Sequence, residues 1–358
     1  MTKIIDCPSY HPHFSPLKKD WKVEAETFKT PILFIIFNRS WTAQKVFDQI
    51  RKLRPAKLYV GADGPRANRP DDQQKCAETR RIIEQIDWPC ELHTRFLDYN
   101  LGCGEGPSSA ITWFFGQEPE GIIVEDDCLP SITFFKYAEE LLEKYRDDTR
   151  VMMIAANNIE NPKDRETDYS YTFSNITYCW GWASWARAWK LFDYKMGHYK
   201  EVYRKGYLMS SYRTVYERTA WEYIFSRMYE GDDRTSRRTI WDYQWQFACM
   251  INSGLVIVPN KNLVENLGFG EGASNTIDPE AFTHVLSSEE MDFPLRHPQF
   301  MMVHRERDLR TFKIMHTSLA SRLKAVIKSL IPAAVVDLIN PFISKKIFMP
   351  RQWRKAFG

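Results

Sequence analysis

Long apolar runs are missing from this sequence of 358 residues. No segment contains the roughly 18 consecutive apolar residues that a membrane-spanning helix needs. The first residues, MTKIIDCPSYHPHFSP, lack the basic start and the continuous apolar core of a signal peptide. We therefore expect a cytoplasmic protein that does not cross a membrane.

Paired cysteines are also missing. The seven cysteines are scattered, and no two of them form a C-x-x-C pair. An odd number of cysteines without such pairs indicates neither a zinc site nor a disulfide framework. A reducing compartment fits this pattern, in agreement with a cytoplasmic location.

Positive charge is concentrated near the C-terminal end, although the whole chain has a formal net charge of only +3. From Arg310 to Gly358, lysines and arginines far outnumber the one acid, Asp337. Apolar residues between Leu323 and Ile339 recur at helical spacing, which predicts a basic amphipathic helix. Such a helix either docks on the body of the protein or binds an anionic membrane surface. We expect no nucleic-acid partner.

Short apolar runs alternate with helical patterns from residue 30 onwards, and 44% of all residues are hydrophobic, enough for a large core. Strands are expected at residues 31–37, 57–63, 91–97, 121–124, 151–156 and 255–259. Helices are expected at residues 40–55, 73–86, 108–115, 132–145, 212–229 and 243–251. This alternation predicts an α/β fold with a mostly parallel, doubly wound sheet.

An acidic triplet, Glu125, Asp126 and Asp127, follows the apolar strand GIIV. The carboxyl ends of central strands in an α/β sheet face the ligand crevice, where clustered carboxylates suit a divalent cation and substrate phosphates. Acids are equally common where a strand simply ends at the surface. The triplet alone leaves both interpretations open.

Two further polar residues follow the first two expected strands. Arg39 comes after PILFIIF, and a guanidinium there could meet a diphosphate. Asp63 ends the second strand, where its carboxylate could bind a nucleotide base or ribose. Each has a structural alternative, because Asp-Gly-Pro, for example, is common turn chemistry.

Two glycine-rich segments stand out. NLGCGEGPSS, Asn100 to Ser109, reads as a turn that leads into a helix and could bring backbone N–H groups close to an anion. It lacks the Gly-Lys-Ser/Thr ending of a Walker A loop and does not follow the first strand, so ATP hydrolysis and NAD binding lose support. ENLGFGEGASNT, Glu265 to Thr276, is either a mobile lid or an ordinary connection.

Aromatic residues gather in YCWGWASWARAW, Tyr178 to Trp189, which we expect to be an aromatic loop. Tryptophan rings stack on sugar faces, although such clusters more often belong to a core. WDYQW, Trp241 to Trp245, opens a helix. Asp242 is either an acid favoured by the helix dipole or a general base set between aromatic walls.

Taken together, these elements resemble glycosyltransferases of the GT-A fold, and in particular the N-acetylglucosaminyltransferase I type found in the Golgi. The resemblance runs from Pro31 to Thr276 and keeps six elements in the same order: the strand before Arg39, Asp63-Gly64, the strand with EDD, which stands for the DXD motif, WGWASW, Trp241-Asp242 and the NLGFGEG loop. It implies a nucleotide-sugar transferase domain with a Rossmann-like sheet.

The resemblance also implies roles for single residues. Asp127 would ligate Mn²⁺ or Mg²⁺ that bridges the diphosphate, and Asp242 would deprotonate the acceptor hydroxyl in an inverting displacement. The acceptor would lie against Trp180, Trp182 and Trp241. The nucleotide-sugar would be bound by Phe37, Arg39, Asp63, Gly102, Glu125, Asp126 and Phe269.

On this basis we divide the chain into an extension (1–29), a catalytic domain (30–305) and a basic amphipathic tail (306–358). Within the catalytic domain, residues 30–130 would bind the nucleotide-sugar and residues 131–305 the acceptor.

The donor would be a UDP-sugar, with UDP-N-acetylglucosamine suggested by the resemblance alone. Because no Golgi-type anchor is present, we expect a cytoplasmic enzyme of glycan or polysaccharide synthesis, held at the inner membrane face by its tail and acting on a glycan or lipid-linked acceptor. Two alternatives remain: a sugar nucleotidyltransferase, and a carbohydrate-binding protein without catalysis.

Overall fold

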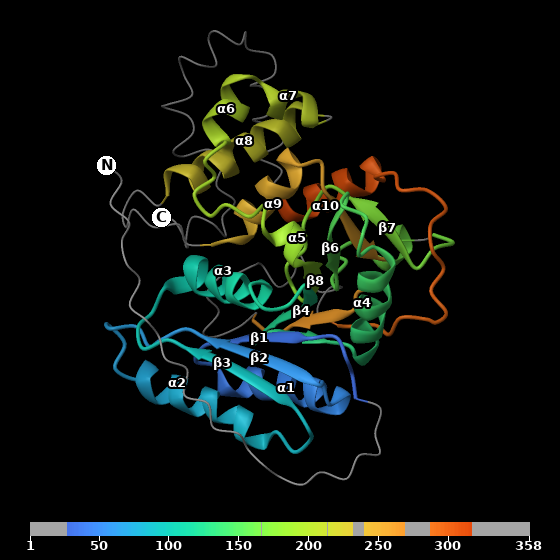
Figure 1. Cartoon of the computed structure of the whole chain (residues 1–358). Helices are drawn as coiled ribbons and strands as arrows, with labels where there is room; N and C mark the ends of the chain where they lie inside the picture. The colour runs from blue at the N-terminus through green and yellow to red at the C-terminus, as the bar shows by residue number, and fades with distance from the viewer. Residues whose placement is uncertain (1–26, 166, 213, 232–239, 269–286, 317–358) are drawn as a thin grey trace.

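An eight-stranded sheet forms the centre of the protein (Figure 1). The structure is a computed structural model, and it describes residues 27–165, 167–212, 214–231, 240–268 and 287–316. The strands are β1 (Ile32–Ile36), β2 (Lys57–Ala62), β3 (Glu91–Phe96), β4 (Glu120–Glu125), β6 (Val151–Ala155), β7 (Tyr171–Ser174), β8 (Trp182–Trp185) and β9 (Leu255–Pro259). Their order across the sheet is β3-β2-β1-β4-β8-β6-β9-β7.

Parallel pairing dominates this sheet. β1 pairs in parallel with β2 and β4, β2 with β3, and β6 with β9. β8 runs antiparallel to both of its neighbours, and β7 runs antiparallel to β9. All five residues of β1 are buried, which explains its uninterrupted ILFII sequence. The predicted α/β fold with a mostly parallel central sheet is confirmed.

Helices cover both faces of the sheet. They are α1 (Ser40–Leu53), α2 (Asp72–Arg80), α3 (Gly102–Phe115), α4 (Ile132–Lys144), α5 (Ala186–Trp189), α6 (Tyr199–Arg204), α7 (Tyr207–Ser211), α8 (Val215–Glu230) and α9 (Asp242–Ile251), with short 3-10 turns at Arg81–Gln85 and Pro162–Asp164. α1 and α4 share one core with Phe34, and α3 shares the other with Leu33. In Figure 1, α3 lies between the sheet and the layer of α6 to α9.

The first glycine-rich segment is helical, although its sequence predicts a turn up to Ser108. α3 begins at Gly102, whose φ of +81° is rarely adopted by residues with a side chain. The N–H groups of Leu101 and Gly102 donate to the Asp63 carboxylate at 2.8 Å and 2.9 Å. The first backbone N–H groups of a helix have no acceptor within the helix. The Asp63 carboxylate accepts two of them here, so the helix can begin earlier than expected.

The tryptophan-rich segment contains a central strand rather than the expected loop. Residues Trp182–Trp185 form β8, which is inserted between β4 and β6. All four residues are buried, with Trp182 in the core on the α3 face and Ala183 in the core on the α1 face. A half-exposed strand is recognised by alternating apolar and polar residues. These four residues are all buried and do not alternate in this way, so the sequence pattern could not identify the strand.

A second, two-stranded sheet lies beside the acidic triplet. β5 (Cys128–Pro130) pairs antiparallel with β10 (Val264–Asn266), with Asn266 opposite Cys128. The backbone N–H of Leu267 also donates to the carbonyl of Asp127 at 2.7 Å. The beginning of the expected lid is therefore held next to the acids, while the rest of it, including Phe269, lies outside the described residues.

The last described helix, α10 (Arg305–His316), packs on the body of the protein. Phe312 is fully buried in the core, and Glu160, only 2% exposed, accepts hydrogen bonds from Nε of Arg307 (2.7 Å) and Nε of Arg310 (3.0 Å). The start of the predicted tail thus belongs structurally to the body. The amphipathic helix expected further along the chain lies outside the described residues.

None of the helices that the structure describes is long and apolar enough to cross a membrane.

Replacing Glu160 tests the attachment of α10. Glu160→Ala leaves the Arg307 guanidinium, 9% exposed, buried without its carboxylate. We expect the free energy of unfolding, measured by urea denaturation, to fall by about 3–5 kcal/mol. Asp87→Ala, which breaks the exposed ion pair with Arg51, is the control and should cost less than about 1 kcal/mol. A similarly small change in both variants would contradict this account of α10.

Candidate active site

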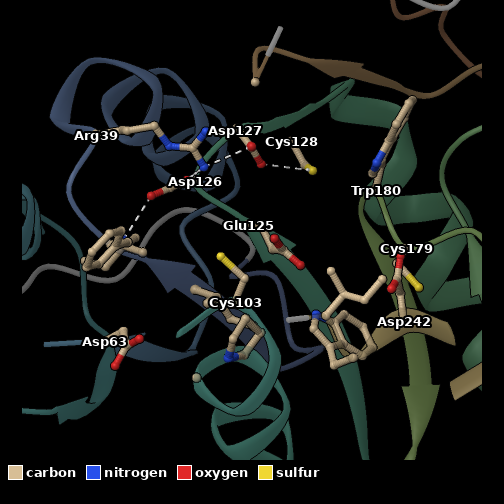
Figure 2. Close-up of a pocket in the computed structure, with 18 of the residues that line it drawn as sticks. Arg39, Asp63, Cys103, Glu125, Asp126, Asp127, Cys128, Cys179, Trp180 and Asp242 are labelled. Carbon is tan, nitrogen blue, oxygen red and sulfur yellow. Dashed lines mark hydrogen bonds and ion pairs between the residues drawn. The ribbon is translucent and has the colours of Figure 1, made fainter. Parts of the chain in front are cut away.

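A cavity of about 1200 Å³ lies at the carboxyl ends of β1, β2 and β4 (Figure 2). The strand ends and the start of α3 form one wall, and the segment around Trp180 together with the start of α9 forms the other. This is the edge at which α/β sheets bind ligands. Arg39, Asp63, Glu125, Asp126, Asp127 and Asp242, predicted from separate motifs, all line this cavity.

The acidic triplet does not form one cluster, because its side chains diverge. Asp126 is nearly buried; its Oδ2 accepts the backbone N–H of Phe37 at 2.9 Å, and its Oδ1 accepts Nη2 of Arg39 at 2.6 Å. The same Nη2 lies 2.9 Å from Oδ2 of Asp127. Burial raises the pKa of Asp126, and the charge of Arg39 opposes that rise.

Glu125 points to the other side of the strand end, towards Asp242 (Figure 2). Burial raises its pKa well above the ordinary value for glutamate, and the negative charges of Asp127 and Asp126 raise it further. The raised pKa favours the protonated carboxyl, which can donate a hydrogen bond to a ligand oxygen.

Asp242 begins α9 on the opposite wall of the cavity. Its Oδ1 accepts the N–H of the next residue, Tyr243, at 3.0 Å, which orients the carboxylate at the helix start. Burial raises the pKa of Asp242 to about 6. The group is thus ionised at neutral pH but is more basic than an exposed aspartate, as a general base requires.

Asp63 also lines the cavity, but its carboxylate already serves the protein backbone. It accepts the N–H groups of Gly64, Leu101 and Gly102 and the side-chain amide of Asn100, all at 2.8–3.1 Å. Burial raises its pKa, and these N–H donors oppose the rise. Its most evident function in this geometry is to position the start of α3 against the cavity.

A pair of side chains that the sequence did not indicate lies near Phe37. The Arg66 guanidinium is 5.3 Å from the centre of the Phe37 ring and forms a two-pronged ion pair with buried Asp72. Asp72 accepts the amide of Asn38 as well, at 2.8 Å. Because the aspartate fixes the guanidinium, Phe37 and Arg66 form a rigid surface of the kind that stacks on planar ligands. The DGPR pattern pointed to Asp63, either as a turn residue or as a nucleotide ligand, and not to Arg66.

The aromatic residues divide into two groups. Trp180 and Trp241 line the cavity, whereas Trp182 is fully buried and packs against Trp241 with ring centres 5.8 Å apart. Trp182 therefore lies behind the cavity wall and cannot contact an acceptor, contrary to its predicted role. Trp180 and Trp241 do reach the cavity, and an acceptor contact is proposed for these two residues. Trp182 and Trp180 have the same side chain and differ in exposure: Trp182 is fully buried, whereas Trp180 borders the cavity.

The surroundings of Asp127 can accommodate a cation. Asp127 is the more open of the two aspartates, with 18% of its side chain exposed, and the side-chain oxygen of Asn266 lies on the same side of the cavity. A Cβ added at Gly268 would come within 2.5 Å of Asp127 Oδ2 and 2.9 Å of Asn266 Oδ1, so the glycine keeps the space between these oxygens open. Within the described ranges no three acidic, histidine or cysteine side chains form a group that could hold a metal ion.

No protein-family model matches this chain, and no curated protein matches it in sequence. Among solved structures it is similar to mouse xyloside xylosyltransferase 1, with 12% identity, a TM-score of 0.32 and coverage of 63% of this chain and 81% of that one. It is also similar to 4-diphosphocytidyl-2C-methyl-D-erythritol synthase from Anaerococcus prevotii DSM 20548, with 13% identity, a TM-score of 0.26 and coverage of 52% and 80%. HddC from Yersinia pseudotuberculosis has 7% identity, a TM-score of 0.25 and coverage of 39% and 68%. These distant likenesses carry no argument about activity.

Removing the Asp63 carboxylate tests its part in positioning α3. Asp63→Ala leaves the N–H groups of Leu101 and Gly102 without their acceptor, so we expect the free energy of unfolding to fall by about 1–3 kcal/mol in urea denaturation. Asp98→Ala, on the exposed loop nearby, should change it by less than about 0.5 kcal/mol. Equal stabilities of the two variants would argue against this role.

Proposed function

We propose that this protein is a GT-A-type glycosyltransferase that moves a sugar from a nucleoside-diphosphate donor to an acceptor hydroxyl with inversion. The observation that carries the proposal is the placement of two chemical groups in one cavity. Arg39 with Asp126 and Asp127 forms one end, and Asp242, with its raised pKa, lies on the opposite wall. An inverting displacement needs a leaving-group site and a base on opposite sides of the sugar.

On the donor side, Arg39 would bind the diphosphate, because a guanidinium matches phosphate oxygens. Phe37, stiffened by Arg66, would lie against the base, and Asp63 with Gly102 would shape the pocket through the start of α3. Glu125 and Asp126 would approach the sugar and ribose, and Phe269 would close over the donor. A UDP-sugar, and within that class UDP-N-acetylglucosamine, is the donor we favour.

A divalent cation, Mn²⁺ or Mg²⁺, fits beside Asp127 and, when bound, would neutralise charge on the departing diphosphate. Asp127 would be its protein ligand, and the side-chain oxygen of Asn266, which accepts the Gly268 N–H at 2.7 Å, lies on the same side of Gly268. The pairing of Asp126 with Arg39 and with the Phe37 N–H leaves Asp127 as the aspartate that is more free to take this role.

On the acceptor side, Asp242 would accept the proton of the attacking hydroxyl. The hydroxyl oxygen then forms a bond to the anomeric carbon while the bond from that carbon to the diphosphate oxygen breaks. Trp180 and Trp241 would hold the acceptor ring against the wall that Trp182 supports. We further propose a glycan or lipid-linked acceptor and a cytoplasmic enzyme whose C-terminal tail contacts the inner membrane face.

A donor panel tests this function. UDP-, GDP-, CMP- and dTDP-sugars, each with Mn²⁺ or EDTA, would be incubated with wild type and with Asp127→Ala, and release of the nucleotide would be measured. We expect slow hydrolysis of one nucleotide class that EDTA stops and that falls at least tenfold in the variant. No hydrolysis and no binding of any donor would favour a carbohydrate-binding protein instead.

Replacing Asp242 tests the base. Asp242→Asn removes the proton acceptor and should lower kcat by about 10²- to 10⁴-fold. In wild type the rate should fall as the pH drops through about 6, because the protonated carboxyl cannot accept the acceptor's proton, and should level off above that pH. Asp98→Asn, outside the cavity, is the control. Unchanged turnover of Asp242→Asn would reject the assignment.

A further inference from the structure

Arg39 connects the two aspartates to which the proposed function gives different roles. Its Nη2 is 2.6 Å from Asp126 Oδ1 and 2.9 Å from Asp127 Oδ2. The Asp126 side chain is only 4% exposed and has a second fixed donor in the Phe37 N–H. The Asp127 side chain is 18% exposed, and its Oδ1 accepts a long hydrogen bond, 3.5 Å, from Sγ of Cys128. The contact with Asp126 is therefore the firm one, and the contact with Asp127 can be exchanged.

A cation that binds Asp127 has to share Oδ2 with this guanidinium. Gly268 leaves space next to Oδ2 open, but Nη2 of Arg39 contacts the same oxygen at 2.9 Å. A divalent cation next to a guanidinium is repelled by it, and the repulsion is strong where little water separates the charges. Without another anion in the cavity, Arg39 thus disfavours the cation.

We propose that Arg39 is an internal counter-ion that keeps Asp127 from binding a divalent cation until a nucleoside diphosphate enters. This inference rests on the proposed function and adds the order in which the site is filled. The diphosphate offers Arg39 new oxygen partners, so its Nη2 can leave Asp127 while the guanidinium stays near Asp126. Asp127 Oδ2 then becomes available to the cation, which the phosphates also attract.

The proposal predicts that binding of the nucleotide and binding of the cation strengthen each other, which can be measured. If the nucleotide raises the affinity for the cation, the cation raises the affinity for the nucleotide by the same factor. A different account, in which Arg39 only neutralises the buried charge of Asp126, predicts that UDP raises the affinity for Mn²⁺ by the same factor with and without Arg39. The two accounts therefore differ in the coupling between UDP and the cation.

The test is calorimetric titration of the full chain with Mn²⁺, with and without saturating UDP. Arg39→Gln removes the charge but keeps an N–H donor for Asp126, and it should bind Mn²⁺ alone roughly 5- to 150-fold more tightly than wild type, the usual range of coupling between sites. UDP should raise the Mn²⁺ affinity of wild type by a larger factor than that of Arg39→Gln. Asp127→Asn should lose this Mn²⁺ binding in both conditions.

Arg51→Gln is the matched control, since it removes one positive charge from α1, the helix that directly follows Arg39, at the exposed pair with Asp87. It should bind Mn²⁺ as wild type does. Arg39→Met gives a second variant should Arg39→Gln not fold, because it removes the positive charge next to Asp127 while keeping a long side chain, and it should also strengthen Mn²⁺ binding.

Mn²⁺ binding by the Arg39 variants that is no tighter than in wild type would overturn the counter-ion role, even if UDP binds normally. Failure of UDP, GDP, CMP and dTDP to bind wild type would instead overturn the proposed function. In that case the titration with Mn²⁺ alone would still decide the role of Arg39, so the two failures can be told apart.

Discussion

The ion pair between Arg39 and Asp126 organises the end of β4, and the arrangement of the cavity follows from it. β1 and β4 are parallel neighbours with Ile35 opposite Glu125, so the residues that follow each strand emerge at the same edge. Asp126 is nearly buried, and a buried charge without a partner costs several kcal/mol. The guanidinium and the Phe37 N–H meet this requirement and fix Asp126 against the loop after β1. With Asp126 fixed, Glu125 is directed towards the wall of Asp242 and Asp127 stays at the open side (Figure 2).

Buried carboxylates hold the other loops of this edge in the same way. Asp63, at the end of β2, accepts backbone N–H groups at the start of α3, and Asp72, at the start of α2, accepts the backbone N–H and the side chain of Arg66. In this partly buried region, each carboxylate thus accepts the hydrogen bonds of loop N–H groups that would otherwise have to be donated to water. Loops that are ordered before a ligand arrives lose less conformational entropy on binding, so these contacts favour affinity without touching the ligand.

The sequence predicted the parallel core well because β1, β2 and β4 are continuous apolar runs followed by polar residues, a pattern with few other interpretations. It also brought Arg39 and Asp127 to one site, since the ends of parallel strands meet at one edge, whereas Asp242, at the start of a helix, was grouped with them only through the family resemblance. It could not predict β8, whose four residues carry no strand period, nor the early start of α3, which depends on a carboxylate about 40 residues away. Local patterns do not contain such contacts. The same limit applies to Trp182, whose burial is set by neighbours from other elements.

Charge at this end of the cavity restricts what can enter it. Asp126 and Asp127 together carry two negative charges against the one positive charge of Arg39, while burial raises the pKa of Glu125 and so favours its uncharged form. A diphosphate adds further negative charge, and like charges 4 Å apart repel by about 4 kcal/mol at an effective dielectric constant near 20. Arg39 can be shared among these groups but cannot neutralise them all. A nucleoside diphosphate that entered here and engaged Arg39 would therefore leave negative charge unbalanced, and Asp127, the more open carboxylate of the pair, is where a cation would meet it.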